Sequence, residues 1–162
     1  MVTAFKTASA NGNGDCAGKL DSDLSELLEK LAKTDADFVR VGFSDGTYQV
    51  RIGDYWMVVR SRFADEFDFM RLDRALRSRI TEQGWHYGLG LMSSAVLHGR
   101  LARICIPPSS TQTYVESCPL PFIPRPLWIW ASHPTEDAIA LLRAYVTAVE
   151  KIEERLNVSN AA

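Results

Sequence analysis

The stretch from Phe38 to Arg62 constrains the fold more than any other part of the sequence. It contains two turn pairs, Asp45-Gly46 and Gly53-Asp54, each flanked by runs rich in β-branched and aromatic residues. Dipeptides of this kind between such runs are a strong short-range signal for β-hairpins. The stretch therefore predicts three consecutive antiparallel strands that are joined by two-residue turns.

With two-residue turns, Val41 pairs with Val50 in the first hairpin, and Tyr48 pairs with Val59 in the second. Side chains alternate between the two faces of a sheet, and a shift of one residue would mix the apolar and polar sets. We expect one face to join the core, and it collects Val39, Val41, Phe43, Tyr48, Val50, Ile52, Tyr55, Met57 and Val59.

The opposite face of this meander is polar and carries several arginines. The predicted register places Arg40 directly opposite Arg51, and like charges in such a pair are unfavourable. Stacking of Arg51 on Trp56, acidic side chains from another element or an anionic ligand would each offset this repulsion. Solvated arginines on an ordinary surface are the plain alternative. The candidate site for an anion or an acidic partner comprises Arg40, Arg51, Trp56 and Arg60.

Three amphipathic helices are predicted around the strands. A leucine stripe marks the first one, which Asp21 or Asp23 caps, and it consists of Leu20, Leu24, Leu27, Leu28 and Leu31. The second helix runs from about Asp65 to Gln83, with Gly84 as its stop signal. The last helix starts near 132–134, with proline in its first turn, and runs to about Asn157.

The second half of the chain also contains strand signals. A hairpin is predicted over 87–106, with its turn at His98-Gly99. A proline-rich connection follows over 107–126, and within it 113–117 fits a short edge strand. The segment 127–131 reads LWIWA and is apolar on both faces, which is typical of a central strand or of one that a partner covers.

These elements give the order α-βββ-α-ββ-(β)-α. Strands that pair with their sequence neighbours, together with helices that cover an apolar sheet face, predict the α+β class with an antiparallel sheet. The chain has 162 residues, which fits one domain with an ordinary core. We expect a flexible leader over 1–19, a single globular domain over 20–157 and a tail over 158–162.

Composition narrows the classes of partner and the compartment. The formal net charge of −2 and the pI of about 5.9 make nucleic acid an unexpected partner. Neither a membrane-spanning apolar run nor a secretory signal is visible in the sequence. Cys16, Cys105 and Cys118 are odd in number and irregularly spaced, which argues against a disulfide framework. We therefore expect a cytoplasmic protein.

No motif in the sequence predicts catalysis or a cofactor. Phosphate-binding, nucleophile-elbow and HExxH patterns are missing. Cys105, Cys118 and His133 lack the paired short spacing of zinc ligands, so we expect no metal site. We therefore assign no catalytic residue.

Trp128 and Trp130 are the remaining candidates for a binding site. They lie two positions apart in a strand, so both face the same way. Such aromatics anchor protein interfaces or line apolar pockets, and packing in the core is the alternative. We interpret them as interface residues, and an apolar strand of this width favours a homodimer.

Two resemblances accompany this interpretation. The segment 72–106, LDRALRSRITEQGWHYGLGLMSSAVLHGRLARICI, resembles the C-terminal small-domain segment of pyridoxal-phosphate-dependent amino-acid decarboxylases. That resemblance implies a small-domain-like fold and carries over no catalytic residue. The order α-βββ-α-ββ-α is similar to that of type III secretion chaperones, which are small, acidic, cytoplasmic homodimers that bind unfolded segments of effector proteins. It implies a chaperone-like role.

The sequence thus predicts a non-enzymatic, chaperone- or adaptor-like module that binds a protein or peptide, and that is dimeric. The alternative is a domain that binds a small molecule or an anion, with or without catalysis, through the arginine face of the meander.

Overall fold

A computed structural model describes residues 13–93, 98–108 and 126–160. In this part of the chain, three helices and two three-stranded antiparallel sheets confirm the predicted α+β class. The elements in chain order are α1 (Asn13–Thr34), β1 (Val39–Val41), β2 (Thr47–Ile52), β3 (Tyr55–Arg60), α2 (Glu66–Glu82), β4 (His86–Ser93), β5 (His98–Ile106), β6 (Leu127–His133) and α3 (Asp137–Asn160).

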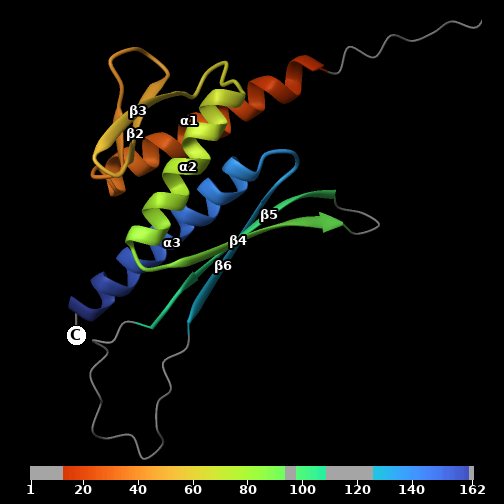
Figure 1. Cartoon of the computed structure of the whole chain (residues 1–162). Coiled ribbons are helices and arrows are strands. Elements are labelled where there is room, and N and C mark those ends of the chain that lie inside the picture. The colour runs from red at the N-terminus through yellow and green to blue at the C-terminus, as the bar shows by residue number, and fades with distance from the viewer. Residues whose placement is uncertain (1–12, 94–97, 109–125, 161–162) are drawn as a thin grey trace, which may run out of the picture.

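The helices form a layer between the two sheets (Figure 1). Helices α1 and α2 pack against the sheet β1-β2-β3, whereas α3 packs along β5 and β6 of the sheet β4-β5-β6. Contacts of α3 with both other helices join the two halves. The strands thus make two sheets rather than the one that the sequence suggested, and the helices cover one face of each.

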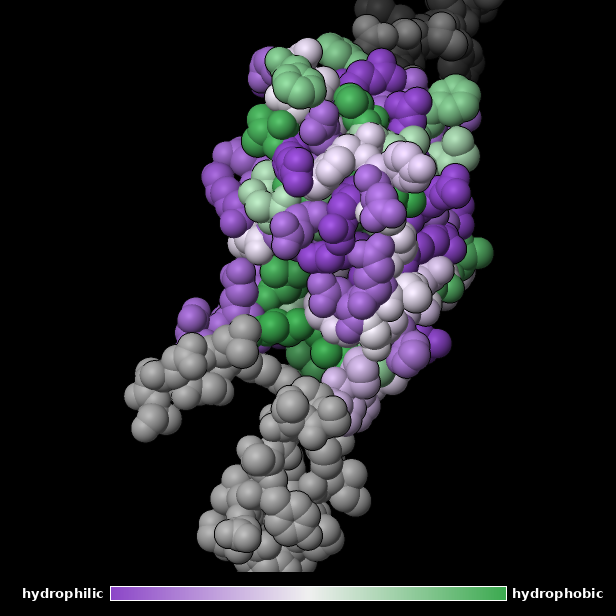
Figure 2. All heavy atoms as spheres, turned by 60° about the vertical axis from the view of Figure 1, so that its left-hand side comes forward, coloured by the Kyte–Doolittle hydropathy of each residue, from purple (hydrophilic) through white to green (hydrophobic). Residues whose placement is uncertain are grey.

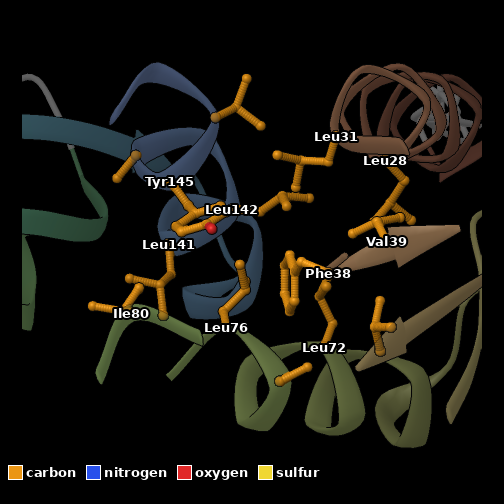
Figure 3. Close-up of a cluster of buried hydrophobic side chains, with 14 of the residues drawn as sticks. Leu28, Leu31, Phe38, Val39, Leu72, Leu76, Ile80, Leu141, Leu142 and Tyr145 are labelled. Atoms are coloured by element: carbon orange, nitrogen blue, oxygen red, sulfur yellow. The ribbon is translucent and has the colours of Figure 1, made fainter. Parts of the chain in front are cut away.

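One continuous core fills the space between these layers (Figure 3). Each helix contributes a leucine-rich stripe, as the sequence periodicity predicts. Phe38, which directly precedes β1, meets Tyr145 of α3 edge-to-face, with 5.5 Å between the ring centroids. The fully buried side chains include Leu24, Leu28 and Leu31 of α1, Leu72, Leu76 and Ile80 of α2, and Ile139, Leu141 and Leu142 of α3.

The register of the meander is confirmed for one hairpin and wrong for the other. Strands β2 and β3 pair as predicted, from Tyr48 with Val59 to the tight turn at Gly53. Strands β1 and β2 are shifted by two residues, since Val41 pairs with Tyr48 instead of Val50. A four-residue loop replaces the two-residue turn, because the backbone N–H of Gly42 already donates to the carbonyl of Thr47.

A shift of two residues keeps every side chain on its predicted face, but it does not bury all of them. Val39, Tyr48, Val50 and Val59 are buried as expected. Val41, Phe43 and Tyr55 are exposed, and Phe43 is 98% exposed, so their assignment to the core is wrong. All three lie beside the turns at the ends of the sheet, where the described elements leave them uncovered.

Helix boundaries differ from the prediction mainly at the two ends of the chain. The second helix is confirmed, with Asp65 as its N-cap and Gly84 in a positive-φ conformation after its last turn. The first helix already begins at Asn13, so it includes residues 13–19 of the predicted leader. The last helix begins at Asp137 and continues to Asn160, into the predicted tail.

The turn predicted at His98-Gly99 is wrong. Ser93 pairs with His98, so both residues of the predicted turn belong to β5. Glycine is required at 99 for packing, because a Cβ there would lie 2.9 Å from the carbonyl oxygen of His133 on β6. The predicted edge strand 113–117 lies outside the described residues.

Strand β6 pairs only with β5 in the described sheet and therefore lies at its edge. The prediction of a central strand is thus wrong within this part of the chain, and the alternative of a strand that a partner covers stays a prediction. None of the helices in the described ranges is long and apolar enough to cross a membrane.

Candidate binding surface

The sheet β4-β5-β6 has one face on the core and one face directed outward. Its inward side chains include Ala102, Ile104 and Ile129, which are buried against α3. The alternation of side chains then directs Trp128 and Trp130 outward, where they are 48% and 54% exposed. The structure therefore places both predicted interface tryptophans on the surface, and packing in the core does not explain them.

The two indoles form a stacked pair on this surface. Their ring centroids are 6.4 Å apart, and the ring planes are inclined by 28°. Arg103 pairs with Trp130 across β5 and β6. Its guanidinium carbon lies 5.7 Å from the ring centroid of Trp128 and 5.9 Å from that of Trp130, within cation–π range of both. We call Arg103, Trp128 and Trp130, with Gly88 beside them, the tryptophan face.

Because Gly88 has no side chain, it leaves the space that the side chain of Arg103 occupies. It pairs with Arg103 on the other side of β5, and a Cβ at this position would lie 2.6 Å from Nε of Arg103. The arginine therefore lies directly over a glycine, where any larger residue would force it to move. Gly90 continues this row along β4, and nothing lies within 4 Å of its Cβ position.

The tryptophan face carries a positive charge that is not neutralised nearby. Strands β4, β5 and β6 contain no aspartate or glutamate. Among the described residues, Arg103 has no carboxylate partner, and its guanidinium lies against the two indoles and over Gly88. Arg100, the other arginine of this sheet, is paired with Asp137 at 3.9 Å. The outward face thus offers one free guanidinium beside two aromatic rings.

The arginines of the meander make contacts that differ from the predicted ones. Arg40 lies opposite Gln49, not Arg51, so the expected repulsion between two arginines does not arise in this form. Arg40, and not Arg51, stacks on Trp56, with its guanidinium carbon 3.7 Å from the ring centroid. Arg51 pairs with Glu82 at the end of α2, at 3.2 Å.

Arg60, the fourth member of the predicted anion site, is paired with two carboxylates at the start of α2. Its Nε donates to Asp68 at 2.9 Å, and its guanidinium also pairs with Asp65. Figure 2 shows that hydrophilic side chains cover most of the face that includes this first sheet. Arg51 and Arg60 are therefore paired with carboxylates, whereas Arg40, like Arg103, stacks on an aromatic ring and has no carboxylate partner among the described residues. Within the sheet β4-β5-β6, Arg103 is the one arginine without a carboxylate partner there.

A buried polar network lies inside the helical layer, and no pattern in the sequence predicts it. Asp35 accepts hydrogen bonds from Arg79 at 2.7 Å and from the hydroxyl of Tyr145 at 2.6 Å. Burial raises the pKa of the Tyr145 hydroxyl, and its hydrogen bond to Asp35 raises it further. A hydroxyl held in its neutral form and a paired arginine stabilise packing here, so this network is structural.

His133 also has a structural role, because its side chain caps the turn over 134–136 that leads into α3, which begins at Asp137. Its Nδ1 accepts hydrogen bonds from the backbone N–H groups of Thr135 at 3.3 Å and Glu136 at 2.9 Å. An acceptor nitrogen must be unprotonated. Burial lowers the pKa of His133, and the charge of Arg143 lowers it further, while Glu136 and Asp23 act in the opposite direction.

We expect this cap to make stability depend on pH. Because the pKa of His133 is lower in the folded state, its contribution is fully present above the unfolded value of about 6.5 and decreases as the pH falls from there toward the folded value. Urea unfolding at intervals between pH 7.5 and 5 measures this. His133→Asn retains a capping acceptor that does not titrate, so its free energy of unfolding should fall less over this range than that of the wild type.

Exposed His98 provides the matched control, since His98→Gln removes a histidine that caps no helix. This variant should keep the pH dependence of the wild type. An equal loss of stability in His133→Asn and in the wild type would contradict the role of the cap.

Among the described residues, no group of three histidine, cysteine or carboxylate side chains is placed so that it could hold a metal ion. Cys105 is a buried free thiol of β5, and Cys118 lies outside the described residues. Comparisons of the chain with protein-family models, with curated proteins and with solved structures found no match.

Proposed function

We propose that this chain is a non-enzymatic module that binds a protein or peptide, with the tryptophan face as its contact surface. The observation that carries the proposal is the stacked, half-exposed pair Trp128 and Trp130. Tryptophan and arginine are the residues most enriched among those that dominate binding energy at protein interfaces. Two indoles beside an arginine therefore fit an interface better than they fit an ordinary solvated surface.

The exposed area of the two indoles gives an estimate of the binding free energy that comes from covering them with a partner. A covered tryptophan buries about 150–250 Å². Since each of the two rings is about half exposed, burying the exposed half stabilises a complex by about 2–3 kcal/mol per ring at ~25 cal/mol per Å². This is enough for both rings to act as anchors of an interface, while immobilisation of the partner offsets part of the gain.

Selection from a library of displayed random peptides tests the proposal. We expect the wild-type chain to yield peptides whose affinity falls at least about 100-fold for Trp128→Ser/Trp130→Ser, as loss of two anchors implies. The matched control is Phe43→Ser/Tyr55→Ser, which removes two exposed aromatics from the other sheet. Circular dichroism verifies that both variants remain folded. The proposal fails if no peptide is selected, or if the selected peptides bind the tryptophan variant as tightly as the wild type.

A chaperone- or adaptor-like role, a homodimer and a cytoplasmic location belong to the same proposal. The free thiol of Cys105 is compatible with a reducing compartment. A second copy of the chain is itself a protein partner, and sedimentation velocity of the wild type and the double tryptophan variant tests for it. Dimerisation that depends on the tryptophans would place the second copy on this face.

The alternative of an anion- or small-molecule-binding domain has less support. It relied on arginines of the meander that were free to bind, whereas Arg51 and Arg60 are already paired with Glu82 and with Asp68 at the start of α2. An anion would have to displace these carboxylates, and only Arg40, which stacks on Trp56, has no carboxylate partner among the described residues. We therefore prefer the module that binds a protein or peptide.

A further inference from the structure

The tryptophan face combines two features that together specify the chemistry of its occupant. We propose that it binds an extended acidic peptide segment in which a carboxylate pairs with Arg103 while a neighbouring proline or aromatic side chain stacks on Trp128 and Trp130. This inference rests on the proposed function and adds the chemical class of the partner.

Charge complementarity selects an acidic occupant. Arg103 is exposed and unpaired among the described residues, and the strands around it carry no carboxylate. By contrast, Arg51 and Arg60 of the first sheet are paired with carboxylates, as with Arg51 and Glu82 at 3.2 Å. A guanidinium that contacts aromatic rings still presents N–H donors that can bind a carboxylate in a bidentate manner. The one free cation of this face therefore fits an aspartate or glutamate side chain.

The aromatic pair sets the spacing within the peptide. An extended chain rises about 3.3 Å per residue, so side chains two positions apart are separated by about 6.6 Å. The two ring centroids are 6.4 Å apart, which matches residues i and i+2 of such a chain. Arg103 lies nearly equally far from both rings, at 5.7 and 5.9 Å. The acidic residue should accordingly lie one or two positions from the residue that stacks.

The β4 side of the face leaves room for a peptide backbone. Arg103 fills the space over Gly88, but the Cβ position of Gly90 has open space within 4 Å. A glycine with open space above it allows another chain to approach closely. Proline and aromatic residues suit the indoles because rigid extended segments dock on aromatic-lined surfaces with little loss of conformational entropy.

The same observations disfavour single-stranded nucleic acid, whose bases would also stack on indoles. Binding a polyphosphate chain uses several cations, since the affinity depends on the number of phosphates that are neutralised. On the outward side of β4, β5 and β6, Arg103 is the only arginine and no lysine is present. The chain as a whole carries a formal net charge of −2. One cation fits one carboxylate, not a phosphate backbone.

Charge reversal tests the inference. Peptides are selected from one random dodecamer library in parallel against the wild-type chain and against Arg103→Glu. We expect wild-type peptides to be enriched in aspartate or glutamate within two positions of proline or an aromatic residue, and Arg103→Glu peptides to carry lysine or arginine there instead. A synthetic wild-type peptide should bind Arg103→Glu at least 10-fold more weakly, and replacing its acidic residue by lysine should restore much of this loss.

The control variant is Arg74→Glu, which makes the same charge change at an exposed position of α2. It should leave peptide affinity within twofold of the wild type. Unfolding midpoints of both variants exclude misfolding as the cause of any loss.

The possible failures are distinguishable. Peptides that need the tryptophans but show no acidic enrichment, and that bind Arg103→Glu unchanged, would overturn the acidic occupant and leave the proposed function standing. Peptides that bind independently of the tryptophans would overturn both. Tighter binding of oligothymidylate than of any acidic peptide, lost in Trp128→Ser/Trp130→Ser, would assign the face to nucleic acid instead. A wild-type dimer that Trp128→Ser/Trp130→Ser abolishes would assign it to a second copy of the chain.

Discussion

Replacing Asp35 by alanine is expected to lower the free energy of unfolding by about 3–5 kcal/mol, because it leaves a buried charge without its partner. Asp35 follows α1, and its carboxylate accepts hydrogen bonds from Arg79 of α2 and Tyr145 of α3. The side chains of Asp35 and Arg79 are only 10% and 14% exposed. Water can therefore replace little of what the carboxylate provides, and the guanidinium would keep only the more distant carboxylate of Glu82, at 3.8 Å.

Urea unfolding of Asp35→Ala and the wild type at neutral pH measures this loss. Asp23→Ala is the matched control: Asp23 also pairs with an arginine of another helix, Arg143, at 2.8 Å, but about a third of each side chain is exposed. That pair should contribute no more than about 1 kcal/mol. A similar, small effect of both substitutions would show that the Asp35 network contributes little to stability.

The second large effect is expected for Asp68→Ala, which should lower the free energy of unfolding by about 2–3 kcal/mol. Asp68 is 1% exposed at the start of α2. It accepts hydrogen bonds from the backbone N–H groups of Asp65 and Arg60 and from Nε of Arg60, and its own N–H donates to Asp65. Loss of a buried acceptor that serves several donors costs more than loss of one exposed hydrogen bond. The end of β3 and the start of α2 would both lose the carboxylate that joins them.

Thermal or urea unfolding of Asp68→Ala tests this expectation against Glu66→Ala. Glu66 is an exposed carboxylate in the same first turn, so its removal reports only the interaction with the helix dipole, about 0.3–1 kcal/mol. If the two variants lose equal stability, the hydrogen bonds of Asp68 contribute nothing beyond its charge.

Local signals explain which parts of the fold could be predicted. The tight turn at Gly53 and the β-rich runs beside it gave the β2–β3 register, and Asp65 with Gly84 gave the ends of α2 within one residue. The β1–β2 register was wrong by two residues because Asp45-Gly46 lies inside a longer loop that Thr47 stabilises through its own hydrogen bonds. Hydrogen bonds between side chain and backbone of this kind are not visible in a dipeptide signal.

The candidate site was predicted only in part. Trp128 and Trp130 could be found because residues two apart in a strand share a face, which requires no knowledge of the partner strand. Arg103 could not be found, because its place beside them depends on the register of β5 with β6 and with β4. The Asp35 network joins residues separated by 44 and 110 positions in the chain, a distance at which no local pattern operates.

The helical layer between the two sheets has a consequence for how this protein can change during evolution. Substitution effects on stability are nearly additive when sites lie more than about 7–10 Å apart and share no partners. The outward faces of the two sheets lie on opposite sides of that layer (Figure 1). Mutations that adapt one face to a new partner can therefore accumulate without compensating changes on the other, so that each sheet can diverge at its own rate.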